Sequence, residues 1–247
     1  MKRENPATVI LAAGKGTRMK SDLAKVLHPI CGKPMLWHVV ALAEKIGSEK
    51  TVVVTGHQAD LIKEAMKDED LIYVHQEKQL GTAHAVLQAG DALRDFDGDV
   101  LILCGDVPLL LHSTIAGLLE NHRAGGGAIT VMTALLDDPG NYGRVVKNKE
   151  GEVLKIVEAR DANTEEKMIK EINTGIYCAE NAFLFEAVRK IDNKNAQGEY
   201  YLTDIFELAR REKHKTGSFI IDDPSEAMGI NTPDDLKTAE RIMRDRS

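Results

Sequence analysis

The sequence predicts an α/β fold with a Rossmann-like, doubly wound, mainly parallel sheet and a small β-rich lobe. Two observations carry this prediction. Short apolar runs of strand length alternate with helical patterns through the first half of the 247 residues. Such alternation is typical of parallel strands joined by crossover helices that cover both faces of a sheet. Beyond residue 140, short β-rich runs separated by turn residues follow one another directly, which favours a hairpin.

The first half begins with a buried strand that enters a tight turn. Residues 9–12 are an apolar run that leads into Gly14-Lys15-Gly16, where glycine allows the chain to turn sharply. Apolar side chains then recur at helical spacing from Met35 to Ile46, between Pro34 and Gly47, so we predict the first crossover helix here. The same patterns predict, in chain order, a strand at 51–55, a helix at 60–66, a strand at 71–75, a helix at 82–92 and a strand at 100–104.

The second half contains the predicted lobe. A helix at 113–122 and a strand at 128–136 continue the alternation, but the β-rich runs 142–147 and 153–158 are separated only by the turn residues 148–151. The later elements predicted are a strand at 173–178, helices at 182–190 and 204–211, a strand at 216–221, and a polar helix at 234–244 capped near Thr232 and Pro233. No repeat, low-complexity tract or linker interrupts the chain, so we expect residues 1–247 to form one domain.

Composition narrows the class of protein. Hydrophobic residues make up 43% and charged residues 29% of the chain, as in ordinary soluble globular proteins. The net charge of −7 disfavours sequence-independent binding to nucleic acid or to anionic membranes. Cys31, Cys104 and Cys178 are too far apart for a metal knuckle and odd in number for a disulfide framework. Without a signal peptide or an 18-residue apolar run, we expect a cytoplasmic protein that binds neither nucleic acid nor membrane.

The segment Leu11-Ala12-Ala13-Gly14-Lys15-Gly16-Thr17-Arg18-Met19 indicates an anion-binding loop. Its glycines let backbone amides turn toward a bound anion, and Lys15 and Arg18 add positive charge beside them. The loop lacks the third glycine of a dinucleotide fingerprint and the Gly-Lys-Ser/Thr ending of a Walker loop. Lys25 follows between apolar flanks that could hold its ammonium toward the same cleft.

Asp106 is the residue that most directly suggests a metal. It follows the buried strand predicted at 100–104 and precedes Pro108, so its carboxylate is expected at the carboxyl end of a strand, where open α/β sheets bind ligands. A hard oxygen ligand in that place suits Mg²⁺, which binds one or two protein groups together with phosphate and water. The histidines show neither metal-ligand spacing nor a partner nucleophile, so no catalytic triad is supported.

Several segments together resemble the sugar-phosphate nucleotidyltransferase family, and within it the N-acetylglucosamine-1-phosphate uridylyltransferases of the GlmU type. The segments are the glycine loop, Lys25, Gln76 to His84, Gly105-Asp106, Tyr142-Gly143-Arg144, Ile156-Val157-Glu158, Glu171 to Gly175, and Asn195 to Asp204. The resemblance runs from Val9 to Asn231. The glycine loop specifies only the superfamily, whereas the last two segments are far more specific.

This resemblance implies a role for each candidate residue. It implies catalytic roles for Arg18 and Lys25 at the phosphates, and a Mg²⁺ ion held by Asp106 and Asn231. The residues it places around UTP are Leu11, Ala12, Ala13, Gly14, Lys15, Lys25, Gln76, Gln79, Gly81, Thr82, Cys104 and Gly105. Those it places around the sugar are Gly143, Glu158, Asn173, Tyr201 and Thr203. Without the resemblance, Asn231 has the pattern of a turn or helix-cap residue, and Gln76 and Glu158 that of polar strand-end residues.

The resemblance implies transfer of UMP from UTP to N-acetyl-α-D-glucosamine 1-phosphate, with release of pyrophosphate. The segment Asn231-Thr232-Pro233-Asp234-Asp235 departs from the Asn-Asn-Arg usual in the GlmU type, which leaves glucose 1-phosphate or another sugar 1-phosphate open. A non-catalytic nucleotide-sugar sensor is a further alternative, although Lys15, Arg18, Lys25 and Asp106 are all present. No hexapeptide repeats of a left-handed β-helix follow, so we expect neither acetyltransferase activity nor a β-helix trimer from this chain.

Overall fold

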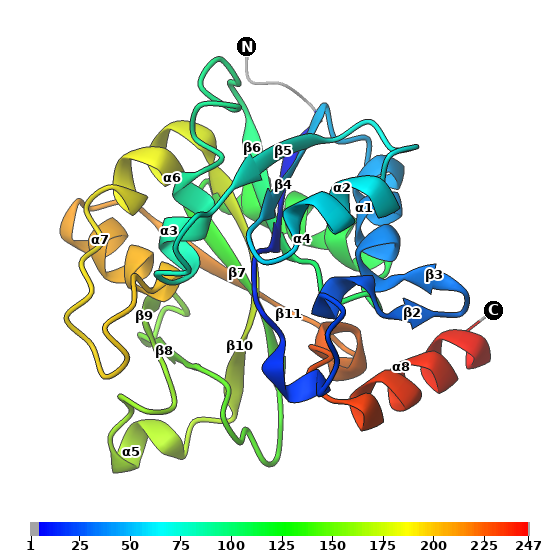
Figure 1. Cartoon of the computed structure of the whole chain (residues 1–247). Coiled ribbons are helices and arrows are strands. Elements are labelled where there is room, and N and C mark those ends of the chain that lie inside the picture. Colours follow the sequence, from blue (N-terminus) through cyan, green and yellow to red (C-terminus); the bar gives the residue numbers. More distant parts are fainter. Residues whose placement is uncertain (1–4, 247) are drawn as a thin grey trace.

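The computed structural model describes residues 5–246. The first residues of the polar N-terminal segment, 1–4, and Ser247 lie outside this range. The strands of the central sheet are β1 (Ala7–Ala12), β4 (Lys50–Thr55), β5 (Ile72–His75), β6 (Asp99–Cys104), β7 (Ile129–Leu135), β10 (Glu171–Glu180) and β11 (Thr216–Ile220). Their spatial order is β11-β7-β10-β6-β1-β4-β5 (Figure 1). Pairing is parallel except along β10, which runs antiparallel to β6 and β7. The predicted fold class is confirmed.

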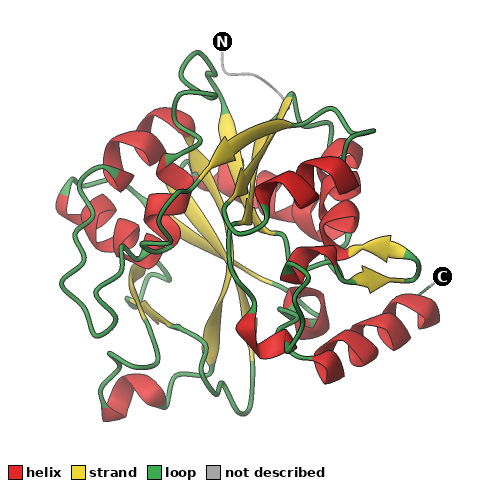
Figure 2. Ribbon diagram, in the orientation of Figure 1, coloured by secondary structure: helices red, strands yellow, loops and turns green. Residues whose placement is uncertain are grey.

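Helices cover both faces of this sheet, as the alternating pattern predicted. The helices are α1 (Met35–Lys45), α2 (Ala59–Ala65), α3 (Thr82–Leu87), α4 (His112–Gly125), α5 (Thr164–Lys167), α6 (Asn181–Val188), α7 (Ile205–Arg211) and α8 (Pro233–Asp245). Helices α3, α6 and α7 lie on one face, and α1, α2 and α4 on the other (Figures 1 and 2). Successive residues of a strand point to opposite faces of the sheet and so pack into two different hydrophobic cores. Val9 packs in the core on the α3, α6 and α7 side, and Ile10 in the core on the α1, α2 and α4 side.

The predicted lobe is a hairpin continuous with the sheet. Strands β8 (Arg144–Lys147) and β9 (Val153–Val157) pair antiparallel, and Arg144 also pairs with Ile172 of β10. The turn predicted at 148–151 closes it, because Asn148 Oδ1 accepts hydrogen bonds from the amides of Glu150 and Glu152. The lobe and the main sheet therefore share hydrogen bonds at β10.

Most predicted elements differ from the observed ones by one to three residues at an end, but one helix is much shorter than predicted. The helix predicted at 82–92 ends at Leu87. After it, the backbone hydrogen bonds span three residues and not the four of an α-helix: the amide of Ala89 donates to the carbonyl of Val86, and that of Gly90 to the carbonyl of Leu87. Gly90 lies against the ring of Phe185 on α6, where a Cβ would meet both this ring and the carbonyl of Leu87. Packing between α3 and α6 thus coincides with the end of the helix.

The structure adds short elements that the sequence patterns did not indicate. They are β2 (Pro29–Ile30), β3 (Lys33–Pro34), helix α5, and the 3₁₀ turns η1 (Thr17–Met19), η2 (Lys25–Leu27), η3 (Leu202–Asp204) and η4 (Pro224–Ala227). The hairpin β2–β3 and helix α8 enclose a third, small core that includes Ile30 and Ile230.

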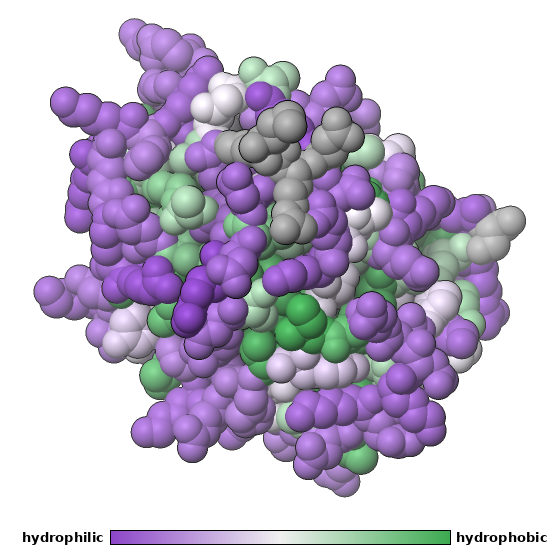
Figure 3. All heavy atoms as spheres, turned by 90° about the horizontal axis from the view of Figure 1, so that it is seen from above, coloured by the Kyte–Doolittle hydropathy of each residue, from purple (hydrophilic) through white to green (hydrophobic). Residues whose placement is uncertain are grey.

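Hydrophilic side chains dominate the surface seen from above, interrupted by small apolar areas (Figure 3). Among the described residues, no helix combines the length and the apolar character needed to cross a membrane.

Candidate active site

Two cavities meet at the carboxyl end of β6. The smaller has a volume of about 280 Å³ and lies toward β1 and α3, and the larger has a volume of about 470 Å³ and lies toward the loop that precedes α8. Cys104 and Asp106 line both of them. The cleft is therefore divided into two compartments that share one boundary, at the end of a parallel strand where open α/β sheets place their ligands.

The smaller cavity gathers most of the residues that the sequence places around UTP. Those that line it are Leu11, Ala12, Ala13, Gly14, Lys25, Gln76, Gln79, Gly81, Thr82 and Cys104. Lys15 is exposed on the loop after β1 and lines neither cavity. Gly105 is buried behind the site, where its amide donates to the carbonyl of Leu11 at 2.9 Å. The structure brings these residues together, and their contacts with a nucleotide remain predictions.

The loop between β1 and α1 is shaped so that Lys25 reaches the cleft. Gly16 has a φ of 64°, and a Cβ there would lie 2.4 Å from the Cβ of Lys25, so only glycine fits. Gln58 holds the loop from the other side. Its Oε1 accepts from the amide of Ala24 and its Nε2 donates to the carbonyl of Asp22, each at 2.6 Å.

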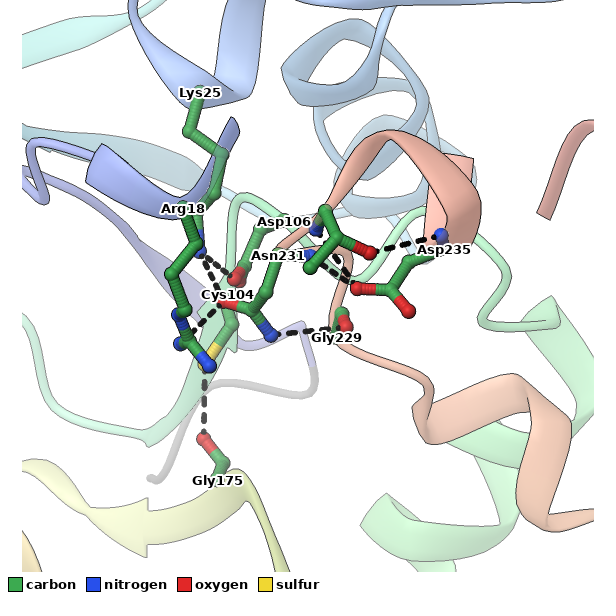
Figure 4. A network of polar contacts seen from close by, with 9 residues as sticks. Arg18, Lys25, Cys104, Asp106, Gly175, Gly229, Asn231 and Asp235 are labelled. Carbon is green, nitrogen blue, oxygen red and sulfur yellow. Dashed lines mark hydrogen bonds and ion pairs between the residues drawn. The ribbon is translucent and has the colours of Figure 1, made fainter. Parts of the chain in front are cut away.

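A network of charged and amide groups lies at the boundary of the two cavities (Figure 4). The Lys25 ammonium donates to the Asp106 carboxylate and, at 3.0 Å, to Asn231 Oδ1. Arg18 donates to the same Asn231 oxygen at 2.9 Å. Two cationic side chains and one carboxylate, from three separate segments, therefore converge where the two cavities meet.

Asn231 is held in place by backbone contacts on both sides. The amide of Ile230 donates to the carbonyl of Asp106 at 2.9 Å, which fixes the loop before α8 against the end of β6. Asn231 Nδ2 donates to the carbonyl of Gly229 at 3.1 Å, so Oδ1 is the atom that faces Lys25 and Arg18. The residue that caps α8 is Thr232, whose hydroxyl accepts from the amide of Asp235. Asn231 is therefore not the helix cap, and its side chain is available to the site.

The oxygens of Asp106 and Asn231 fit a divalent cation. Both accept from the single ammonium of Lys25, so they already converge on one positive charge. Within residues 5–246, no group of three or more His, Cys, Asp or Glu side chains is arranged so that it could hold a metal ion. A pair of oxygen ligands instead suits a cation such as Mg²⁺, which takes its remaining ligands from phosphate and water.

The amide of Gln76 has a fixed orientation at the smaller cavity. Its Nε2 donates to the carbonyl of Gly81 at 3.1 Å and lies 2.9 Å from Nδ1 of His84. Because a carbonyl can only accept, the amide nitrogen must face Gly81, and Oε1 is left without a hydrogen-bond partner among the described residues. Gly81 has a φ of 117°, and a Cβ there would lie 2.5 Å from the carbonyl oxygen of Tyr200. The site therefore offers a ligand an acceptor at Gln76.

Cys104 is a neutral thiol at the shared boundary. Burial and the nearby Asp106 carboxylate raise the pKa of its thiol to about 12, although the Lys25 ammonium acts in the opposite direction. Its Sγ donates to the carbonyl of Gly175 at 3.4 Å. A thiol with this pKa is protonated at neutral pH, so Cys104 does not supply a nucleophilic thiolate.

None of the five residues predicted at the sugar site lines the larger cavity, and two of them lie next to residues that do. Gly143 and Asn173 are linked by a backbone hydrogen bond of 2.9 Å, and each adjoins a residue that lines the cavity, Tyr142 and Thr174 respectively. Thr203 donates to Glu158 at 3.4 Å. Burial raises the pKa of Glu158 despite this hydrogen bond, and Asp161 and Glu199 add to the effect.

Tyr201 completes this group, and its hydroxyl accepts from Nε2 of Gln197 at 2.7 Å. Burial raises the pKa of the Tyr201 hydroxyl, which favours its neutral form. The five residues thus lie on β10, in η3, or within one residue of the ends of β8, β9 and η3. Their role toward a sugar stays a prediction.

Some residues of the cleft were missed by the sequence patterns. The larger cavity is also lined by Asn141, Tyr142, Thr174, Met228, Gly229 and Asp235, and the smaller by Glu199. Tyr142 and Thr174 lie within segments that carry the resemblance, so their position was indicated without their role. Nothing in the local sequence identifies Asp235. It lines the cavity because the loop before α8 packs against the end of β6 and places the first turn of α8 there.

Comparisons with known proteins agree with this geometry. The sequence model of the nucleotidyl transferase family matches residues 7–226. The chain is 48% identical over 247 residues to the bifunctional protein GlmU of Desulfotalea psychrophila, covering 100% of this chain and 73% of that protein. It is 52% identical over 238 residues to GlmU of Geobacillus thermodenitrificans, covering 96% of this chain and 52% of the relative. The chain thus spans between about half and three quarters of the length of these relatives.

A solved structure shows the same fold. A UDP-glucose pyrophosphorylase complexed with UDP-glucose superposes with a TM-score of 0.74, over 98% of this chain and 100% of that chain. Its sequence identity of 19% supports similarity of fold alone. Because the family model matches residues 7–226 and relatives about 50% identical cover nearly the whole chain, this chain belongs to the nucleotidyl transferase family.

Proposed function

We propose that this protein transfers UMP from UTP to N-acetyl-α-D-glucosamine 1-phosphate. A phosphate oxygen of the sugar phosphate attacks the α-phosphorus of UTP, and the bond from that phosphorus to the oxygen bridging to the β-phosphate breaks. The products are UDP-N-acetylglucosamine and pyrophosphate. The nucleophile is already an anion, so the reaction needs neither a protein nucleophile nor a strong general base.

The observation that carries this proposal is the pair of cavities that meet at Asp106. Direct transfer between two substrates requires that both be bound together with the reacting groups in line, and two cavities with a common boundary allow this. Arg18 and Lys25 lie at this boundary, where the negative charge of the phosphates would accumulate. Hydrogen bonds from such cations to phosphate oxygens are charge-assisted and are worth about 1.5–3 kcal/mol each.

The orientation of Gln76 supports a uracil base. With Nε2 occupied by Gly81, Gln76 offers Oε1 as an acceptor. Uracil has an N–H donor at N3, whereas cytosine has an acceptor at that position. Gln76 Oε1 could therefore hydrogen-bond to N3 of uracil but not to N3 of cytosine. The protein is therefore expected to use UTP in preference to CTP.

The identity of the sugar rests on the relatives. The relatives that are about 50% identical to this chain are GlmU proteins, and the resemblance to their uridylyltransferase part favours N-acetylglucosamine 1-phosphate. The structural neighbour holds UDP-glucose, which keeps glucose 1-phosphate as the second candidate substrate.

Asp106 and Asn231 would hold Mg²⁺. Bound there, the ion would neutralise phosphate charge beside Arg18 and Lys25. In the structure Lys25 is paired with Asp106. Binding of a triphosphate gives Lys25 a second anionic partner, and we expect its ammonium to bind the phosphates. Arg18 is exposed, and its hydrogen bond to Asn231 holds its guanidinium at the boundary of the two cavities. A small rearrangement of this exposed side chain would bring it to the phosphates.

The test is a pyrophosphate-release assay with UTP and N-acetylglucosamine 1-phosphate, in the presence and absence of Mg²⁺. We expect turnover only with Mg²⁺, and little with CTP in place of UTP. Turnover with glucose 1-phosphate alone would select the second candidate. Tight binding of nucleotide sugar without pyrophosphate release would indicate a sensor and reject the enzymatic proposal.

A further inference from the structure

We propose that Tyr177 is a positioning residue that fixes the side-chain amide of Asn173 so that its nitrogen, and not its oxygen, is presented to the sugar phosphate. This inference rests on the proposed function, because Asn173 is assigned to the sugar site there. Tyr177 lies on β10 four residues after Asn173, and no sequence pattern drew attention to it.

The geometry depends on an irregularity in β10. The register with β7 shifts between Asn173 and Tyr177, and Gly175 lies within the shift. The amide of Gly175 donates to Asn173 Oδ1 at 3.0 Å, and the hydroxyl of Tyr177 donates to the same oxygen at 3.0 Å. A backbone N–H can only donate, so the atom that faces Gly175 must be the oxygen of the Asn173 amide.

With its oxygen doubly bonded, Asn173 can offer only its nitrogen to a ligand. Nδ2 of Asn173 has no hydrogen-bond partner within residues 5–246. It is also not buried, so a ligand can approach it. An amide nitrogen is a donor, so the ligand group it fits is an acceptor, such as a sugar hydroxyl oxygen or the carbonyl oxygen of an acetamido group.

The surroundings of Tyr177 keep its hydroxyl in this role. The side chain is only 3% exposed and belongs to the core, where its ring lies 6.2 Å from that of Phe206. Burial raises the pKa of its hydroxyl, and the nearby Glu158 carboxylate raises it further, so the hydroxyl keeps its proton throughout the neutral range. A buried, neutral hydroxyl already bonded to Asn173 is suited to orienting that residue and not to transferring a proton.

The experiment compares two variants that each remove one buried hydroxyl. Tyr177→Phe keeps the ring and deletes the hydrogen bond to Asn173. Tyr73→Phe is the matched control. The Tyr73 hydroxyl is also buried and has no hydrogen-bond partner among residues 5–246, and Tyr73 lies on β5 against the other core. We expect Tyr177→Phe to raise the KM for the sugar phosphate by about 3- to 10-fold, as loss of one neutral hydrogen bond implies. The KM for UTP, and both values in the control, should stay unchanged.

A double-variant cycle tests whether Tyr177 acts through Asn173. If it does, Tyr177→Phe should cause no further loss when added to Asn173→Ala. An equal loss in both backgrounds, or an unchanged KM for the sugar phosphate in the single variant, would overturn the inference.

The substrate and the positioning role can fail separately. If the wild-type protein uses glucose 1-phosphate, the named substrate is wrong and the same cycle is run with that sugar. If it turns over no sugar phosphate, the proposed function is wrong. The side-chain ¹⁵N and ¹H resonances of Asn173 then decide: a shift in Tyr177→Phe but not in Tyr73→Phe supports the orientation, and identical spectra reject it.

Discussion

Lys25 is shared by Asp106 and Asn231 in the structure, and this sharing depends on contacts between distant segments. The sequence could place Asp106 at the end of a strand, because a buried apolar run precedes it and Pro108 follows. It could not place Asn231 beside it without the family resemblance. The contact depends on the hydrogen bond from Ile230 to Asp106, and no local pattern encodes a pairing between such distant residues.

The same limit explains which residues escaped prediction. Glycine loops and strand ends are local signals, so Gly14 and Asp106 could be selected as candidates from the residues alone, whereas Gln76 was selected only through the family resemblance. The orientation of Gln76 depends on Gly81 and His84, and that of Asn173 depends on Gly175 and Tyr177. An amide has two ends, and only its neighbours in the fold decide which one a ligand meets.

Removal of the Asp106 carboxylate tests the proposed metal site. Asp106→Ala deletes one of the two oxygen ligands and leaves Lys25 with Asn231 alone, so we expect turnover to fall by at least about 10²-fold, or about 2.7 kcal/mol of barrier. Steady-state kinetics with titrated Mg²⁺ measures this, and Mn²⁺ binding followed by electron paramagnetic resonance provides a readout that does not depend on activity. Near-normal Mg²⁺-dependent turnover in a folded variant would refute the assignment.

Arg18 provides a test of where the phosphate charge is stabilised. If its guanidinium interacts more strongly with the transition state than with bound UTP, Arg18→Ala should lower kcat by about 10- to 100-fold and change the KM for UTP by less than about 3-fold. Arg211→Ala is the control, because Arg211 is 69% exposed on α7 and its guanidinium pairs with Glu207 at the surface. A normal kcat with weaker UTP binding would make Arg18 a ground-state anchor.

At the scale of elements, the sequence predicted best where periodicity is long and worst where the chain is short or held by tertiary contacts. Helix α1 begins after Pro34 and ends before Gly47, as its signals indicated. Helix α3 ends early where Gly90 meets Phe185. The two-residue strands β2 and β3 have no periodicity to detect, and the bulge in β10 depends on pairing with β7.

The start of α7 carries an unfavourable charge that can be measured. Burial raises the pKa of Asp204 from 3.8 to about 6, with help from Glu207, Asp192 and other carboxylates. Between these two values the folded state binds more protons than the unfolded state, so this group favours folding below pH 4, and the contribution is lost as pH rises through 6. Asp204→Asn should therefore raise the free energy of unfolding at pH 8 and not at pH 4.

The expected gain is modest because Asp204 is partly exposed and its charge is screened. We expect about 1 kcal/mol at pH 8, or about 2–4 °C in Tm for a chain of this size. Thermal unfolding at both pH values measures it. The control is Asp91→Asn, because Asp91 has a 90% exposed side chain paired with Arg94. A gain of equal size at pH 4, or an equal gain in the control, would show that the charge of Asp204 is not the cause.

At the scale of the whole molecule, the candidate site lies where the main sheet meets the lobe. Strands β1 and β6 bring the residues predicted to bind UTP to one edge of the sheet, and β10 connects that edge to the hairpin β8–β9. Alternating strands and helices predicted this architecture, since βαβ patterning leaves few topologies. The sequence did not show that β10 runs antiparallel between β6 and β7, because strand direction inside a sheet is set by the connections on either side.

This shared construction leads to a prediction on sugar selectivity. Glu158 follows β9 directly, Asn173 lies on β10 and Thr203 lies in η3, so a hexose between them would meet polar groups from several directions. A site that hydrogen-bonds an acetamido group leaves polar atoms unpaired when that group is missing, which costs more than the loss of a methylene contact. We therefore expect kcat/KM for N-acetylglucosamine 1-phosphate to exceed that for glucose 1-phosphate or glucosamine 1-phosphate by at least about 10²-fold, or about 2.7 kcal/mol. Competition between these sugar phosphates in one reaction, resolved by mass of the nucleotide sugars formed, measures the ratio directly. Comparable kcat/KM values for glucose 1-phosphate would show that these residues do not recognise the acetamido group. Glucose 1-phosphate would then replace N-acetylglucosamine 1-phosphate as the candidate substrate.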